Sequence, residues 1–229
     1  MMTLKRILLI FGILLIACGI YFFPKMINQR SYDDYLLLVP EKLPATGKYP
    51  LLLYLHGSGS RGDDASLLEG SGPRPFLKKN DLPFVLVSPI CAKYDSWHPL
   101  YLNRLIDSIE AKLPIDEDRI YVTGLSMGGV GTWSLAKSNP DRFAAIAPVC
   151  ARSLFETEEV AALKGVSVWA FHGKKDDVIS YQETEKLVNQ LEALNADVKF
   201  TLYPDLKHAI WDETYNNPEL YDWFLSKSK

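Results

Sequence analysis

A serine flanked by glycines is the feature of the sequence that most clearly points to chemistry. Residues 124–128 read Gly-Leu-Ser-Met-Gly, which is the G-x-S-x-G pattern with Ser126 at its centre. The pattern lies where an expected strand, 119–123, meets an expected helix, 126–138. At such a sharp turn the serine is held in a strained backbone conformation with its hydroxyl exposed, and small neighbours prevent collisions across the turn. We therefore predict that Ser126 is a nucleophile.

A nucleophilic serine needs a base, and four histidines are available: His56, His98, His172 and His208. In hydrolases with this turn the chain order is serine, then acid, then histidine, which leaves only the last two. His172 ends an expected strand and precedes a glycine, so a structural role in bracing a loop is the better interpretation. His208 follows the last expected strand, at the same edge of the sheet as the serine. We predict that His208 is the general base, and an exposed surface histidine is the alternative.

The acid that orients the histidine should follow the penultimate expected strand, 167–171, where Asp176 and Asp177 compete. The acid must point at the imidazole ring to hold its tautomer and stabilise its positive form. Neighbouring residues in an extended loop point in opposite directions, so only one aspartate can do this. Either could instead be a solvated loop carboxylate. From the residues alone, both remain open.

Three motifs together resemble the esterase/phospholipase-carboxylesterase-like branch of the α/β-hydrolases, near polyhydroxybutyrate depolymerases, feruloyl esterases and prolyl-oligopeptidase-like hydrolases. They are Leu-His-Gly at 55–57, Gly-Leu-Ser-Met-Gly-Gly at 124–129, and Phe-His-Gly-x-x-Asp-x-Val at 171–178. The similarity covers about residues 35–226. It implies that the acid is Asp176, although a proline more often stands at the position of Asp177.

An oxyanion hole requires two backbone N–H groups aimed at the developing charge. Met127, directly after the nucleophile, should supply one of them. The resemblance implies that Ser58, in the glycine-rich loop 56–62, supplies the other. Further aromatic and polar side chains lie in loops expected at the same edge and form a possible substrate pocket, with core packing as the alternative for each; they are Trp97, His98 and Trp211. Only a short stretch separates the strands at 143–148 and 167–171, so we expect no helical lid.

Short apolar runs alternate with longer amphipathic segments after residue 31, which predicts a single α/β domain over 31–229. Uninterrupted apolar runs are typical of parallel strands buried on both faces, so we expect the α/β-hydrolase fold: a mostly parallel sheet covered by helices on both faces, with no large lid domain. The expected strands are 35–39, 51–56, 84–89, 119–123, 143–148, 167–171 and 198–203. The expected helices are 100–113, 126–138, 180–194 and 207–226.

The first 30 residues form a separate segment. Lys5 and Arg6 precede an uncharged apolar run from 7 to 23, as in a secretory signal or membrane anchor. Within it, Leu-Ile-Ala-Cys at 15–18 resembles the bacterial lipobox, in which the cysteine (here Cys18) is lipidated. The run stays apolar beyond the cysteine, which favours an uncleaved signal anchor, although its 17 residues are at the short limit for a membrane span. Lipoprotein, signal anchor and cleaved signal all remain open. Because the positive charges should stay inside, we predict a membrane-tethered, extracytoplasmic domain in the bacterial periplasm or at the cell surface.

The overall composition limits the partners. The 229-residue chain carries a formal net charge of −3, which argues against a nucleic-acid partner. No cofactor motif or metal-ligand spacing is present, and Cys91 and Cys150 follow strands too far apart in the expected sheet for a disulfide. We therefore predict a serine esterase that hydrolyses a small-molecule carboxylic ester. A prolyl-oligopeptidase-like peptidase, an acyltransferase and a non-catalytic binding module on the same fold are alternatives, and the oligomeric state is left open.

Overall fold

The computed structural model describes residues 32, 34–154 and 157–229. The predicted signal or anchor segment at 1–30, with Cys18, lies outside the described residues, so the tether stays a prediction. In the ranges that the structure describes, no helix combines the length and the apolar character needed to cross a membrane.

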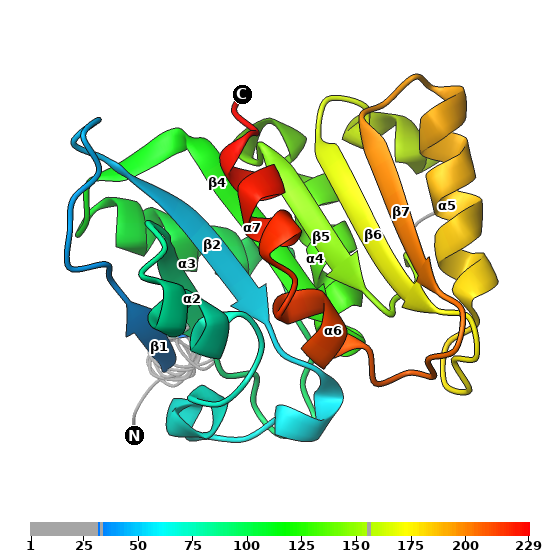
Figure 1. Ribbon diagram of the computed structural model, residues 1–229, viewed down its shortest axis with the longest axis horizontal. Helices are drawn as coiled ribbons and strands as arrows, with labels where there is room; N and C mark the ends of the chain where they lie inside the picture. The colour runs from blue at the N-terminus through cyan, green and yellow to red at the C-terminus, as the bar shows by residue number, and fades with distance from the viewer. Residues whose placement is uncertain (1–31, 33, 155–156) are drawn as a thin grey trace, which may run out of the picture. The chain divides into compact units, whose positions relative to one another are not determined.

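The described residues form a seven-stranded sheet in the order β1-β3-β2-β4-β5-β6-β7. Figure 1 shows the strands from β2 through β4, β5 and β6 to β7 side by side. β1 pairs antiparallel with β3, and the other neighbouring strands are parallel. This arrangement confirms the predicted α/β fold. The strands are β1 (Tyr35–Leu38), β2 (Tyr49–Leu55), β3 (Val85–Pro89), β4 (Ile115–Leu125), β5 (Ala145–Val149), β6 (Ser167–Gly173) and β7 (Val198–Tyr203).

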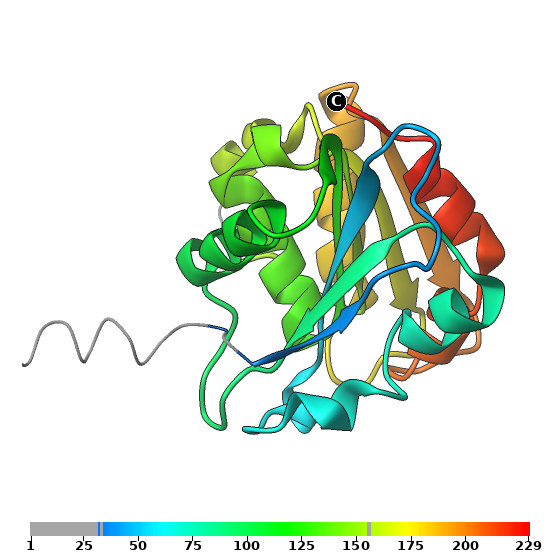
Figure 2. The same cartoon turned by 90° about the vertical axis from the view of Figure 1, so that its left-hand side faces the viewer.

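Helices cover both faces of the sheet (Figure 2). α3, α4 and α5 contribute to one hydrophobic cluster, and α2, α6 and α7 contribute to another on the opposite face. The α-helices are α2 (Arg74–Asn80), α3 (Pro99–Glu110), α4 (Met127–Ser138), α5 (Tyr181–Ala193), α6 (Trp211–Tyr215) and α7 (Pro218–Leu225). Short 3-10 helices are η2 (Ser58–Ser60), η3 (Ala65–Leu68), η4 (Pro140–Arg142) and η5 (Thr157–Leu163).

The apolar run of β2 shows how the sequence builds this double-sided core. Every residue of the strand is buried. Successive side chains of a strand point to opposite faces, so Leu51 and Leu53 join the cluster under α3 and α4, whereas Leu52 and Tyr54 join the cluster under α2 and α7. A strand that serves two cores has no polar face, and for this reason its apolar run is continuous.

The last helix differs from the prediction. Of the segment expected as one helix over 207–226, residues 207–210 form a loop that includes His208, and the rest forms α6 and α7, separated by Asn216 and Asn217. The side chain of Asn217 accepts a hydrogen bond from the Glu219 amide at 3.0 Å and so caps α7. Pro218 stands at the first position of α7, where a missing N–H is tolerated, but it prevents α6 from continuing. The prediction was wrong because the cap lies inside an otherwise continuous apolar stripe.

The cysteines lie where the predicted strand order placed them. β3 and β5 are separated in the sheet by β2 and β4. Cys91 and Cys150, which follow these strands, are both buried free thiols. Burial raises the pKa of Cys91 to about 11 and that of Cys150 to about 12, so both stay protonated at neutral pH.

Candidate active site

Ser126 lies at the turn between β4 and α4, in the strained conformation that the glycine pattern predicts. Its backbone angles are φ 53° and ψ −115°, in a region that non-glycine residues rarely occupy. A Cβ on Gly128 would stand 1.8 Å from the carbonyl oxygen of Leu55, and one on Gly124 would stand 2.5 Å from the carbonyl oxygen of Gly128. Both flanking positions therefore admit only glycine.

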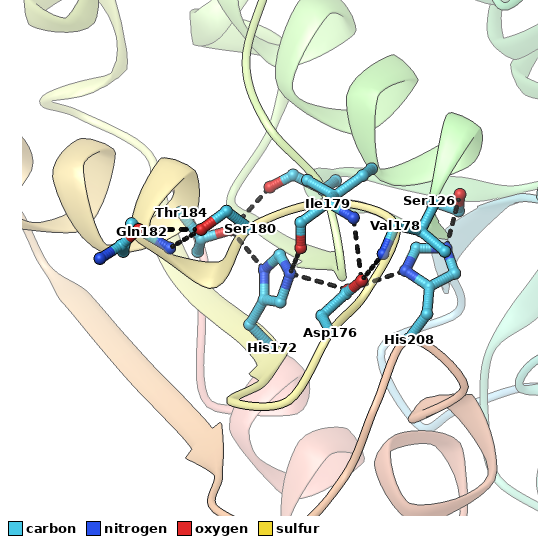
Figure 3. Close-up of polar contacts among 10 residues, drawn as sticks. Ser126, His172, Asp176, Val178, Ile179, Ser180, Gln182, Thr184 and His208 are labelled. Carbon is cyan, nitrogen blue, oxygen red and sulfur yellow. Dashed lines mark hydrogen bonds and ion pairs between the residues drawn. The ribbon is translucent and has the colours of Figure 1, made fainter.

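Three side chains from three separate segments form one hydrogen-bonded chain (Figure 3). The Ser126 hydroxyl oxygen lies 3.0 Å from His208 Nε2, and His208 Nδ1 lies 2.7 Å from Asp176 Oδ2. Because the carboxylate can only accept, Nδ1 carries the hydrogen and Nε2 is free to accept the serine proton. The structure thus brings together the residues predicted as nucleophile, base and acid.

Asp176 is buried yet arranged to stay ionised. Its side chain is fully inaccessible to solvent. Oδ1 accepts hydrogen bonds from the amides of Val178 at 2.8 Å and Ile179 at 2.9 Å. Burial alone would raise the pKa of Asp176, but the hydrogen bonds from His208 and the two amides outweigh it and lower the pKa below its usual value. The carboxylate is therefore negative at neutral pH and can stabilise a positive imidazole.

The neighbouring aspartate has a different environment. Asp177 is exposed, and its carboxylate forms a surface ion pair with Lys207 at 2.8 Å. This ion pair is the main cause that lowers the pKa of Asp177, and the charge of His208 contributes least. The His208 ring forms its hydrogen bond with Asp176 instead. The geometry thus favours Asp176 over Asp177 as the acid, as the motif resemblance implied.

A close contact between two loops brings His208 to the acid. Gly173, at the end of β6, lies against the loop that follows β7, and a Cβ there would stand 2.1 Å from the carbonyl oxygen of Lys207. The Lys175 amide also donates to the Leu206 carbonyl at 2.9 Å, which fixes the two loops side by side. The glycine after His172 is therefore needed for the site to form.

The two residues predicted to supply the oxyanion amides come from different elements near Ser126. Met127 opens α4, so its amide is at the positive end of the helix dipole. Ser58 opens η2 and lines the cavity beside Ser126. The buried His56 ring connects this loop to the segment after β3, because Nδ1 donates to the Gly57 carbonyl at 2.7 Å and Nε2 accepts from the Cys91 amide at 2.9 Å. In a trans peptide the C=O and N–H point in opposite directions, so the Ser58 N–H points away from the His56 ring.

His56 was not predicted to contribute to the site. Its partners fix one neutral tautomer, and burial lowers the pKa of the ring, so it stays uncharged at neutral pH. The position of His56 directly before the glycine of the loop was the only sequence signal for this role.

A cavity of about 690 Å³ opens over Ser126 and His208. Small polar residues of the 57–72 segment form one wall, and residues of α6 and its flank form the other. Its lining includes Ser58, Ser60, Leu67, Ser71, Trp211, Tyr215 and Asn216. The position of Trp211 is compatible with its predicted place in the pocket, and its role in binding substrate stays a prediction. The contributions of Leu67, Ser71 and Tyr215 were not anticipated, because their segments carried no catalytic motif.

Trp97 and His98 do not line this cavity, and their predicted placement in the pocket is corrected. Trp97 is only 6% exposed and belongs to the core, where its ring nitrogen donates to the His56 carbonyl at 3.1 Å. It fills the space above Gly131, whose Cβ would stand 2.7 Å from the tryptophan side chain. His98 instead pairs with Asp95 at 2.9 Å, three residues earlier in the same loop. Among the described residues, no cluster of three His, Cys, Asp or Glu side chains is placed to hold a metal ion.

Comparison with known proteins agrees with the resemblance predicted from the motifs. The dienelactone hydrolase family matches residues 100–221. A bifunctional acetylxylan esterase/xylanase of Neocallimastix patriciarum is 29% identical over 208 residues, which are 86% of this chain and 29% of that protein. A probable feruloyl esterase C of Aspergillus niger is 20% identical over 74% of this chain and 64% of that protein. The crystal structure of a thermostable esterase aligns with a TM-score of 0.72 and 30% identity, over 85% of this chain and 59% of that one. The chain thus spans less than two thirds of each of these proteins.

Proposed function

The chain belongs to the dienelactone hydrolase family of the α/β-hydrolase superfamily, and from this premise we propose that it hydrolyses carboxylic esters through an acyl-enzyme on Ser126. The observation that carries the proposal is the hydrogen-bonded chain from Ser126 through His208 to the buried carboxylate of Asp176. The names of the similar proteins, an acetylxylan esterase and a feruloyl esterase, support the same reaction class.

Each step of the reaction can be assigned to an atom of this chain. His208 Nε2 takes the hydroxyl proton as the Ser126 oxygen attacks the ester carbonyl, and Asp176 stabilises the imidazolium that results. The amides of Ser58 and Met127 bind the oxyanion of the tetrahedral intermediate. When the intermediate collapses, the C–O bond to the alcohol breaks and His208 returns the proton to the leaving oxygen. Water then repeats the sequence and releases the acid.

The proposed substrate is a small ester, in which the acyl carbon reaches Ser126 and the remainder lies in the open cavity beside Trp211. A peptide bond could react by the same machinery, since only the leaving group differs. The test below therefore includes an amide substrate beside the ester.

The test compares matched substrates on the full chain. p-Nitrophenyl acetate and p-nitroacetanilide share an acyl group and differ in the scissile bond. We expect measurable turnover of the ester only, stoichiometric labelling of wild type by a fluorophosphonate, and neither activity in Ser126→Ala. Faster cleavage of the anilide than of the ester would indicate a peptidase rather than an esterase. A wild-type protein that neither hydrolyses esters nor is labelled by the fluorophosphonate would support the non-catalytic binding module.

We also propose that the N-terminal segment tethers the domain outside the cytoplasm. The proposal rests on Lys5 and Arg6 before the apolar run 7–23, with Cys18 inside it. Labelling of whole cells with a palmitate analogue, compared between wild type and Cys18→Ala, distinguishes the tethers. A lipoprotein loses its label in the variant, whereas a signal anchor is never labelled and keeps its full mass. Recovery of the full-length protein in the cytosolic fraction would contradict both versions.

A further inference from the structure

A second histidine lies directly behind the acid, and the mechanism above does not use it. His172 is the penultimate residue of β6 and is completely buried. It is one of two fully buried histidines among the described residues, and the other, His56, holds the opposite loop. A buried titratable side chain in contact with a catalytic carboxylate requires an account of its own.

The His172 ring is surrounded by oxygen atoms (Figure 3). Nε2 lies 3.0 Å from Asp176 Oδ2 and 3.0 Å from the carbonyl oxygen of Ile179. Nδ1 lies 2.8 Å from the Thr184 hydroxyl, which in turn donates to the Ala151 carbonyl at 2.6 Å. The ring therefore connects the acid loop to α5 and to the segment after β5.

These partners determine where the ring hydrogen lies. An ionised carboxylate and a backbone carbonyl can only accept, so a lone pair on Nε2 would face two oxygens at 3.0 Å. Nε2 must carry a hydrogen in the neutral ring and in the charged ring alike. In the neutral ring, Nδ1 is then an acceptor. The single hydrogen of the Thr184 hydroxyl is shared between two acceptors, His172 Nδ1 and the Ala151 carbonyl. Burial lowers the pKa of His172 and so favours the neutral form.

We propose that His172 is a positioning residue for the triad: its Nε2–H donates to Asp176 Oδ2, the same oxygen that accepts the Nδ1–H of His208. The proposal rests on the proposed function of the triad. It extends the expectation that this histidine braces a loop, since Nε2 also lies 3.0 Å from the Ile179 carbonyl.

Sharing one oxygen between two imidazoles has two consequences. The carboxylate receives four N–H donors, two on each oxygen, so it cannot rotate away from His208. The second donor also stabilises the negative charge, which keeps the proton on the His208 side of the Asp176–His208 hydrogen bond during catalysis. Because His172 also holds the Ile179 carbonyl, the turn that supplies the two backbone amides is fixed by the same ring.

The test uses substitutions matched in size but different in donors. The amide nitrogen of Gln reaches the place of Nε2, and the amide of Asn reaches only the place of Nδ1, whereas Met has the length of Gln and no donor. We expect His172→Met to lower kcat for p-nitrophenyl acetate by about 10- to 100-fold, as a displacement of up to about 1 Å at a catalytic group can do. KM should change by less than about 3-fold. His172→Gln should recover kcat to within about 5-fold of wild type, and His172→Asn should not.

Tyr121→Phe is the stability control. It removes the hydrogen bond from a buried tyrosine to the Lys227 carbonyl, outside the site. It should lower Tm about as much as His172→Met does, but leave kcat unchanged. If His172→Met does not fold, the comparison of kcat between His172→Gln and His172→Asn still tests the proposal. The proposal is overturned if His172→Met retains the wild-type kcat, or if His172→Gln and His172→Asn lose activity equally. If wild type itself hydrolyses no ester and takes no fluorophosphonate label, the proposed function fails instead.

Discussion

Replacement of Asp176 by asparagine is the sharpest test of the site, because the structure fixes which way the new amide must face. Oδ1 accepts from the amides of Val178 and Ile179, so the asparagine oxygen will stay there and its NH₂ will replace Oδ2. The NH₂ group then faces two ring nitrogens that now donate, His208 Nδ1 at 2.7 Å and His172 Nε2 at 3.0 Å. Two donors cannot share a hydrogen bond.

His208 must respond by exchanging tautomers, so that Nδ1 accepts from the new amide and Nε2 carries the hydrogen. Nε2 can then no longer accept the proton of Ser126, from which it lies 3.0 Å. We expect kcat for p-nitrophenyl acetate to fall on the order of 10⁴-fold, which corresponds to about 5.5 kcal/mol of transition-state stabilisation. Far-UV circular dichroism should stay native, because the amide keeps the volume of the carboxylate.

Asp177→Asn is the matched control, one residue away with the same chemical change. The Asp177 carboxylate is exposed and pairs with the exposed Lys207 amine, and the charge of His208 has only a minor effect on it. Surface ion pairs of this kind contribute little, so kcat should stay within about 2-fold of wild type. If Asp177→Asn were the more damaging substitution, the assignment of the acid and the hydrogen-bond reasoning behind it would both be refuted.

Further predictions concern the nucleophile, the turn, the acid's charge and the pocket. Ser126→Ala should lower kcat by about 10⁴-fold or more with an unchanged Tm, and retention of a few per cent of activity would disprove the assignment. Gly128→Ala pushes a Cβ to 1.8 Å from the Leu55 carbonyl and should lower Tm by at least about 5 °C, measured by differential scanning fluorimetry. Because the pKa of Asp176 is lower in the folded state than the unfolded value of about 3.9, its ionised carboxylate stabilises the fold above that pH, and this stabilisation is lost as the pH falls through the folded-state pKa. The free energy of unfolding should therefore decline less steeply below about pH 4 in Asp176→Asn than in wild type. Parallel declines in denaturant titrations would contradict this. Trp211→Ala should raise KM about 2- to 10-fold with little change in kcat, and an unaltered KM would remove this side chain from the pocket.

The expected strands are all present within a few residues. Burial explains this best for β2 and β5, which are buried throughout, because a strand between two cores needs an uninterrupted apolar run. A helix cap inside an apolar segment was harder to recognise, and for this reason the sequence analysis missed the break between α6 and α7 at Asn217 and Pro218. α2 was missed as well, since seven residues that begin with Arg-Pro show no helical period.

Site residues were predictable where the chemistry is local and unpredictable where it depends on distant packing. The turn at Ser126 is encoded by five consecutive residues, and the structure has the conformation that they require. The environment of Trp97 depends instead on the His56 carbonyl, 41 residues away, and on a glycine of α4. An aromatic residue in a loop looks the same in the sequence whether it lines a cavity or fills the core. The roles of the triad and oxyanion residues stay predictions until the variants are measured.

Two His-Gly pairs, at the ends of β2 and β6, support opposite halves of the site. In each, the glycine permits a close approach: a Cβ on Gly57 would stand 2.5 Å from the Leu125 side chain, and one on Gly173 would stand 2.1 Å from a backbone oxygen. In each, the buried histidine holds a loop of the candidate site, His56 through the Gly57 carbonyl and His172 through Asp176. Burial lowers the pKa of both rings, so neither changes charge at neutral pH. The frame around the site therefore stays electrostatically constant while the proposed proton transfer takes place between the serine and its base.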